Sequence, residues 1–257
     1  MPRFEFGRNW RDYLAEISEK DIQTAIHALT AFLGTNSLTG RRFLDIGCGS
    51  GVHSLAALRL GASEIVSIDY DPLSVDCTRS LKEKEDNPAS WRIFQWDILS
   101  SQPFPERQPF DVVYAWGVLH HTGDMWRAID QSLLHVNGNG LFYIAIYNKH
   151  WTSPFWKLIK RLYCVSPRPL QRLWFLLYAS WETMKSRIRG GPNPSDRARG
   201  MKWYSDLKDW LGGYPYEYAA ADEIISAVTS KRFVLLKSVP NTGTGCSEFL
   251  FQKKVGP

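Results

Sequence analysis

The stretch that decides the fold of this chain reads Phe43-Leu44-Asp45-Ile46-Gly47-Cys48-Gly49-Ser50-Gly51. It is an apolar strand that ends in an acid and opens into glycines at every second position. Glycine adopts positive φ without strain and lets the backbone come close to a ligand. The run from His53 to Leu58 then predicts a helix whose first N–H groups face that ligand. The sequence therefore predicts a ligand-binding turn at this point.

The spacing of the glycines distinguishes two kinds of ligand. A dinucleotide-binding turn has the pattern Gly-x-Gly-x-x-Gly and places a pyrophosphate at the helix N-terminus. This chain has Gly47-x-Gly49-x-Gly51, with Asp45 two residues before the first glycine. A carboxylate at that position repels a pyrophosphate but suits an ammonium or a sulfonium group. We therefore expect a cofactor that carries positive charge.

The next three predicted strands also end in residues that suit a nucleotide-like ligand. The second strand ends in Asp69, the third delivers Asp97, and the fourth, residues 110–117, runs into Leu119-His120-His121. In doubly wound folds, a carboxylate at the tip of the second strand accepts both ribose hydroxyls. We therefore expect Asp69 to bind a ribose.

Each of these acids also has a plain structural interpretation. Asp45 could be a turn residue or a helix cap, and Asp69 could cap a helix that starts at Asp71-Pro72. Asp97 alone indicates little and gains meaning from its place in the series. Cys48 is most simply a small residue packed in the turn.

Together these motifs resemble class I S-adenosylmethionine-dependent methyltransferases of the small-molecule, ubiquinone-biosynthesis-like group, over residues 41 to about 148. The resemblance implies that S-adenosylmethionine is the cofactor. It also implies a set of cofactor-binding residues at the glycine turn, at the strand ends and in the aromatic N-terminal segment: Asp45, Gly47, Cys48, Gly49, Ser50, Gly51, Asp69, Tyr70, Asp97, Ile98, Trp116, Gly117, Trp10 and Tyr13.

The order of strands and helices predicts an α/β fold. Strands alternate with helical stretches through residue 148, which indicates a doubly wound, mostly parallel sheet. Residues 232–239 and 248–253 form two strands with no helix between them, so they should pair as a terminal antiparallel hairpin. The resemblance implies seven strands in all. We expect a single domain over residues 1–257, made of an N-terminal helical cap (1–40), a cofactor-binding core (41–148), an inserted lid and acceptor segment (149–216) and a last helix with the hairpin (217–257).

The insertion is strongly basic. The net charge of the chain is +5, but residues 151–203 hold eleven lysines and arginines against two acids, so the rest of the chain carries about −4. Three interpretations stay open for this aromatic, basic segment. It is a lid with a solvated outer face, a lid that forms the acceptor pocket and attracts an anionic or lipid-like acceptor, or a nucleic-acid-binding surface. A basic helix rich in tryptophan also suits peripheral contact of residues 151–200 with a membrane.

The chemistry expected near the fourth strand concerns the acceptor. If the acceptor is a hydroxyl, His120 or His121 is the candidate general base, because imidazole titrates near neutrality; each histidine could instead only pack. Ala115-Trp116-Gly117 stands where amino-methylating enzymes have Asn/Asp-Pro-Pro-Tyr, which disfavours nucleobase acceptors. No cluster of acids indicates a metal. Aromatic candidates for the acceptor pocket are Tyr147, Trp203, Tyr204 and Tyr214.

The leading hypothesis is methyl transfer to a small, amphiphilic or lipid-like metabolite by in-line displacement. One alternative is an RNA or protein methyltransferase that uses the basic insertion, although nucleic acid is the less favoured partner. Another is a cofactor-binding module without turnover that docks on a membrane or a partner. The N-terminus lacks the apolar core of a signal peptide, and no apolar run reaches the roughly 18 residues of a membrane span. These features predict a cytoplasmic protein, with peripheral membrane contact as an option.

Overall fold

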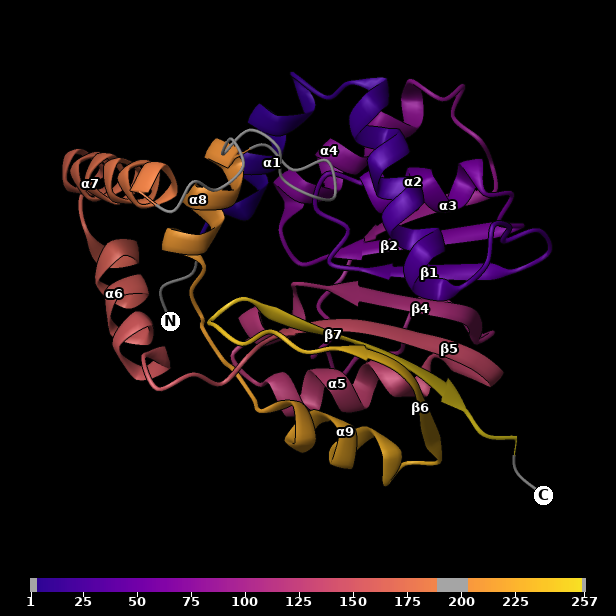
Figure 1. Cartoon of the computed structure of the whole chain (residues 1–257). Helices are drawn as coiled ribbons and strands as arrows, with labels where there is room; N and C mark the ends of the chain where they lie inside the picture. Colours follow the sequence, from indigo (N-terminus) through magenta and orange to yellow (C-terminus); the bar gives the residue numbers. More distant parts are fainter. Residues whose placement is uncertain (1–3, 189–202, 256–257) are drawn as a thin grey trace.

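The computed structural model describes residues 4–188 and 203–255, without the side chains of residues 186 and 203–205. At its centre lies a seven-stranded sheet with strand order β3-β2-β1-β4-β5-β7-β6 (Figure 1). The first five strands are parallel, and β7 runs antiparallel to both of its neighbours. The predicted fold class and its terminal hairpin are therefore confirmed. The strands are β1 (Arg42–Ile46), β2 (Glu64–Asp69), β3 (Trp91–Gln95), β4 (Phe110–Trp116), β5 (Val136–Tyr147), β6 (Phe233–Val239) and β7 (Cys246–Lys253).

Helices cover both faces of the sheet. One face packs against α2 (Glu19–Leu33), α3 (Val52–Arg59) and α4 (Pro72–Glu83), and the other packs against α5 (Met125–Leu134) and α9 (Ala221–Thr229). Side chains of β1 alternate between the two cores: Phe43 packs with the first group, and Leu44 with the second. Because both faces of a parallel sheet are buried, its strands read as continuous apolar runs.

The start of α4 resolves one of the alternatives left open by the sequence. The Asp71 carboxylate caps this helix by accepting a hydrogen bond from the Leu73 N–H at 2.9 Å, with Pro72 at the first helical position. Asp69 accepts the N–H of Asp71 at 2.9 Å instead. The helix cap is thus Asp71, and Asp69 supports the loop that precedes it.

The insertion after β5 forms a layer of its own. It contains α6 (Ser153–Val165), α7 (Arg168–Ile188) and α8 (Trp203–Gly212). Figure 1 shows α6 and α7 away from the sheet, with α8 between them and α1 (Phe6–Leu14). Residues 199–217 alternate polar and aromatic side chains around Gly212-Gly213, a pattern that indicates no regular core face, but Leu207 and Leu211 of α8 are buried in a small cluster with α6 and α7. The glycines and prolines of residues 190–195 predict a break in the insertion, and this stretch lies outside the described residues.

Within the described ranges, no helix is long and apolar enough to cross a bilayer.

Candidate active site

The glycine turn follows β1 directly and is fixed to the end of β2. The N–H groups of Gly47 and Cys48 donate hydrogen bonds to the Ile68 carbonyl at 2.8 and 3.0 Å. Gly47 has a φ of 72°, and a Cβ there would lie 2.2 Å from Val118 Cγ2. The turn therefore needs glycine at this position both for its backbone conformation and for the close approach of Val118, two residues after the end of β4.

The second glycine of the turn is covered by an aromatic ring from the N-terminal helix. A Cβ on Gly49 would lie 2.9 Å from the Trp10 indole of α1. Trp10 packs edge-to-face on Tyr13, with ring centroids 6.0 Å apart. The third glycine serves packing instead, because a Cβ on Gly51 would meet Thr78 of α4 at 2.8 Å.

Two acids beside the turn have raised pKa values. Asp45 is buried, and the Ser54 hydroxyl donates a hydrogen bond to its carboxylate at 2.6 Å. Burial raises the pKa of Asp45 to about 7, and the nearby charge of Asp69 acts in the same direction. Burial also raises the pKa of Asp69 to about 6, although its carboxylate accepts the Gly49 N–H at 3.0 Å. Both acids would gain from a cation in this cavity.

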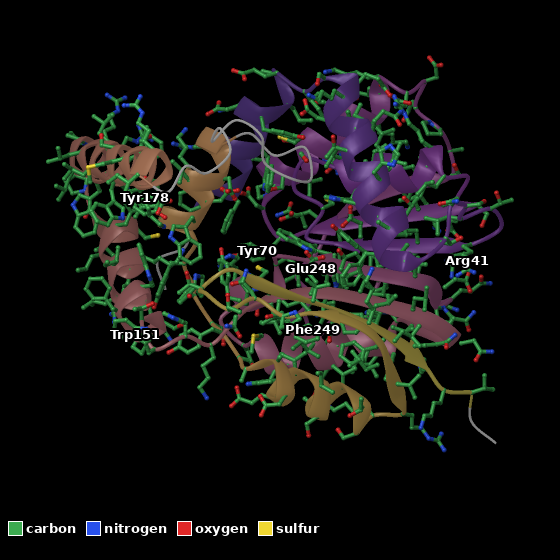
Figure 2. All side chains as sticks on the ribbon, in the orientation of Figure 1. Arg41, Tyr70, Trp151, Tyr178, Glu248 and Phe249 are labelled. Atoms are coloured by element: carbon green, nitrogen blue, oxygen red, sulfur yellow. The ribbon has the colours of Figure 1, made fainter. Side chains whose placement is uncertain are left out.

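The cavity residues that follow β2 and β3 suit a flat ring. Asp97 accepts the Leu99 N–H at 2.9 Å, and Ile98 beside it is buried. Tyr70 is more than half exposed at the rim of the cavity, at the end of β2 (Figure 2). Trp116 and Gly117 close the same region at the end of β4.

Helix α1 connects this region to the insertion. The Gly7 N–H donates a hydrogen bond to the second carboxylate oxygen of Asp71 at 2.8 Å. Two residues later, the Asn9 side chain donates one to Asp209 of α8 at 2.8 Å. One short helix thus holds both the loop after β2 and the insertion.

A single cavity of about 1070 Å³ extends from the glycine turn and the strand ends to the helices of the insertion. All predicted cofactor residues except Gly51 line it, as do Tyr147 and Tyr214 from the predicted acceptor pocket. Trp203 and Tyr204 belong to α8, but their side chains lie outside the described residues. Sequence reasoning missed several wall residues of the insertion, whose only signal was its aromatic density: Trp156, Tyr178, Glu182, Asp206, Asp209 and Trp210.

The cavity is acidic although the insertion is basic. Among the described lining residues, Lys185 is the one lysine or arginine, and it forms an ion pair with Glu182 at 3.0 Å. The described wall therefore offers no unpaired lysine or arginine to an anionic acceptor. This finding does not support the interpretation of the basic segment as a lid that attracts an anionic acceptor. The acids on the wall are Glu5, Asp45, Asp69, Asp71, Asp97, Glu182, Asp206 and Asp209.

The two histidines after β4 differ in position, although both belong to the same turn, η1 (Leu119–His121). His120 is fully buried and does not line the cavity, and its Nε2 finds no hydrogen-bond partner among the described residues. His121 does line the cavity, and its Nδ1 lies 2.6 Å from the Pro215 carbonyl oxygen. Because a carbonyl only accepts, Nδ1 carries the proton and Nε2 keeps a lone pair. The structure thus brings His121, and not His120, to the site.

A buried lysine holds the insertion together behind this wall. Lys160 of α6 is fully buried and donates to the carbonyl of Trp210. Its ammonium lies 4.2 Å from the ring centroid of Trp210 and 4.9 Å from that of Tyr216. Burial lowers the pKa of Lys160 to about 7, whereas the faces of the rings favour the charged form.

Comparisons with known proteins agree with this geometry. A family model described as a methyltransferase domain matches residues 18–217. The chain belongs to this methyltransferase family. It carries an S-adenosylmethionine-dependent methyltransferase domain, which confirms the family and the cofactor expected from the motifs.

The relatives differ in their acceptors. A ubiquinone biosynthesis O-methyltransferase of Rhodopseudomonas palustris is 29% identical over 118 residues, which are 46% of this chain and 44% of that protein. A ribosomal protein L11 methyltransferase of Escherichia coli is 35% identical over 96 residues, 36% of this chain and 31% of that protein. The matched region thus spans less than half the length of these curated relatives.

A solved structure matches nearly the whole chain. The magnesium protoporphyrin IX methyltransferase from Synechocystis, with bound SAH, has a TM-score of 0.58 and 14% sequence identity, covering 96% of this chain and 94% of that one. At this identity the likeness shows the fold alone.

Among the described residues, no group of three or more histidines, cysteines or acids is placed to hold a metal ion.

Proposed function

We propose that this protein transfers the methyl group of S-adenosylmethionine to a small acceptor with an apolar or aromatic body and no net negative charge. The observation that carries the proposal is the continuous cavity from the glycine turn to the aromatic wall of the insertion. Ligand pockets commonly measure about 300–1000 Å³. This cavity of about 1070 Å³ lies just above that range and has room for a cofactor and a second small molecule together.

The residues of the cofactor half fit a cationic donor. Gly49 has no side chain, which lets the Trp10 ring close over the turn, and Asp45 and Asp69 supply negative charge from buried or half-buried positions. We assign Asp69 to the ribose and Asp97 to the adenine amino group. When bound, S-adenosylmethionine supplies a methyl group already activated by its positive sulfonium.

The protein then has mainly to orient the acceptor. Near-attack positioning can supply roughly 7–11 kcal/mol of the barrier. Trp156, Tyr178 and Trp210 offer flat apolar surfaces for this purpose, from three different helices of the insertion. Asp206 on the same wall favours a neutral or cationic acceptor over an anionic one. Burial raises the pKa of Asp209 to about 8, so this neighbour is mostly neutral near pH 7 and becomes an anion at higher pH.

His121 is the residue that we propose to contact the reacting group of a hydroxyl acceptor. Burial lowers the pKa of His121 to about 3, so the imidazole is neutral at physiological pH. A group with such a pKa is a weak base, but its Nε2 lone pair can accept and align a hydroxyl hydrogen bond. We therefore expect an effect near the lower end of general-base assistance, about 10²-fold on kcat.

The experiment that tests the proposal follows labelled methyl groups. The protein is incubated with methyl-labelled S-adenosylmethionine and with separated lipid, polar small-molecule, RNA and protein fractions of a cell extract. We expect label in the lipid or small-molecule fraction. Label found only in RNA or in protein would overturn the proposed acceptor class, and no transfer to any fraction would favour a cofactor-binding module without turnover.

The role of His121 is tested on the labelled fraction with two variants. His121→Ala should lower kcat about 10²-fold and leave the affinity for S-adenosylhomocysteine unchanged. His27→Ala is the matched control, because His27 is exposed on α2 and does not line the cavity. Equal rates for the two variants would remove His121 from the mechanism.

A further inference from the structure

The two outer helices of the insertion carry apolar side chains on their exposed sides. On α6 they follow a spacing of three or four residues at Phe155, Leu158, Leu162 and Val165, which places them on one face. Each is between 44% and 62% exposed. Figure 2 shows Trp151, just before α6, at the edge of the molecule, and it is 85% exposed.

Helix α7 repeats this arrangement over its whole length. Its exposed apolar side chains at a spacing of three or four residues are Leu170, Leu173, Leu177, Trp181, Met184 and Ile188, and Leu176 beside Leu177 is exposed as well. We call the exposed apolar residues of α6 and α7, with Trp151, the outer face of the insertion.

The outer face points away from the rest of the protein. The opposite sides of the same helices, including Tyr163 of α6 and Phe175 of α7, pack with Leu207 and Leu211 of α8 in the small buried cluster. The described part of the chain therefore leaves the outer face uncovered. Exposed apolar side chains gathered in this way on two neighbouring helices mark an interaction site.

Positive charge accompanies these apolar residues. Lys157, Arg161, Arg168 and Arg172 are all exposed on α6 and α7. The one acid between residues 151 and 188 is Glu182, which forms its ion pair with Lys185. Arg161, Arg168 and Arg172 form no ion pair with any described residue.

This charge pattern selects the partner. A second copy of the chain meeting the same face would bring arginines against arginines, and like charges across an interface are unfavourable. A nucleic acid would pair with the arginines but leave the leucines and Ile188 in water. A bilayer that contains anionic lipids satisfies both, because leucine and tryptophan side chains enter the interface while arginines meet the headgroups.

We propose that the outer face of the insertion lies on an anionic lipid surface. The same two helices supply Trp156, Tyr178 and Glu182 to the cavity wall, so docking would place the membrane beside the site. If the proposed function holds, this position suits an acceptor that partitions into the bilayer. The docking itself rests only on the outer face and does not depend on turnover.

The test is flotation of the whole chain with lipid vesicles. We expect binding to phosphatidylcholine vesicles that contain phosphatidylglycerol, little binding to phosphatidylcholine alone, and a decrease with salt. The double variant Arg161→Gln/Arg168→Gln should bind about 25-fold more weakly, since each basic residue near such a surface contributes about fivefold. Leu173→Ser/Leu177→Ser should weaken binding at least about tenfold.

Matched controls lie elsewhere on the surface. Lys84→Gln removes an exposed cation at the end of α4, and Leu134→Ser removes an exposed leucine at the end of α5; both should bind vesicles like wild type. Unchanged far-ultraviolet circular dichroism and S-adenosylhomocysteine affinity would show that the insertion variants fold.

Three outcomes would overturn the docking proposal. They are no vesicle binding by wild type, equal binding by the insertion variants, and a concentration-dependent dimer that Leu173→Ser/Leu177→Ser abolishes. The last result would assign the outer face to a second copy. A wild-type protein that does not bind S-adenosylhomocysteine would instead count against the proposed function. Failure of the docking proposal and failure of the proposed function are therefore distinguishable.

Discussion

The two halves of the cavity are built in opposite ways. The half that we assign to the cofactor, here called the cofactor half, takes its side chains from the carboxyl ends of neighbouring parallel strands, where β1, β2, β3 and β4 deliver Asp45, Asp69, Asp97 and Trp116. The half that we assign to the acceptor, the acceptor half, takes its side chains from helices joined only by long-range contacts, such as the hydrogen bond from Lys160 to the carbonyl of Trp210. The comparison shows that the sheet positions its cavity side chains through short sequence motifs at the ends of strands, whereas the insertion positions its cavity side chains through packing between distant segments of the chain.

The largest expected effect tests the sheet-built half. Asp69→Ala should weaken S-adenosylhomocysteine binding at least about 100-fold, because two hydrogen bonds to a charged acceptor are worth about 1.5–3 kcal/mol each. Isothermal titration calorimetry measures the affinity. Asp76→Ala, which removes an exposed acid of α4, should bind normally. Unchanged binding by Asp69→Ala would show that the strand-end acids do not hold the cofactor.

The next effect concerns the rigidity of the same half. Gly47→Ala should lower the free energy of unfolding by about 3 kcal/mol, since the new Cβ meets both positive φ and Val118. Gly34→Ala has a similar φ of 69° but open space around it, so it should cost only about 1 kcal/mol. Urea denaturation measures both. Equal losses would mean that the turn tolerates side-chain bulk.

A smaller effect probes the helical half through pH. The pKa of Lys160 is lowered in the folded state, so the unfolded chain binds more protons between about pH 7 and the ordinary lysine pKa. The contribution of Lys160 to stability should therefore fall as the pH falls through this window, by about 2 kcal/mol from pH 10 to pH 8. The buried and partly buried cysteines have raised pKa values and act in the opposite direction, so denaturation of wild type is compared with that of Lys160→Met. The stability difference between the two should change by this amount, whereas the difference between wild type and Lys157→Met, exposed on the same helix, should stay constant; a constant difference for Lys160→Met would contradict the prediction.

The smallest effect is the pH dependence of cofactor affinity, which probes the cofactor half. The pKa of Asp45 is raised to about 7, so this acid protonates as the pH falls through neutrality and loses its attraction for the ammonium of the cofactor. S-adenosylhomocysteine affinity should fall roughly tenfold from pH 8 to pH 6. Asp45→Asn should show a flatter titration curve over this range. A wild-type affinity that rises at low pH would argue against binding of the cofactor ammonium group by the Asp45 carboxylate.

The fold and the cofactor half were predictable because their signals are local. A strand that ends in an acid and glycines at fixed spacing can be recognised within ten residues, and the parallel sheet then brings the tips of the strands together. The terminal hairpin followed from two strand patterns with no helix between them, whereas the total of seven strands came from the family resemblance.

For the acceptor half, the sequence predicted the segment of the chain that forms it, but not most of the individual residues that line it. Asn9 and Asp209 are 200 positions apart, and no local pattern links them. His120 and His121 are neighbours with equal chemistry, and only the packing of η1 shows which of them faces the cavity. The acidic wall was hidden for the same reason, because the charge of a segment does not tell which side of a helix each charge occupies.

Helix α1 is hydrogen-bonded at one end to Asp71 and, two residues later, to Asp209. Its Trp10 also covers the glycine turn. Any displacement of this short helix would break all three contacts together, and the two ends of the cavity would then open in a single movement. One and the same element thus covers both ends.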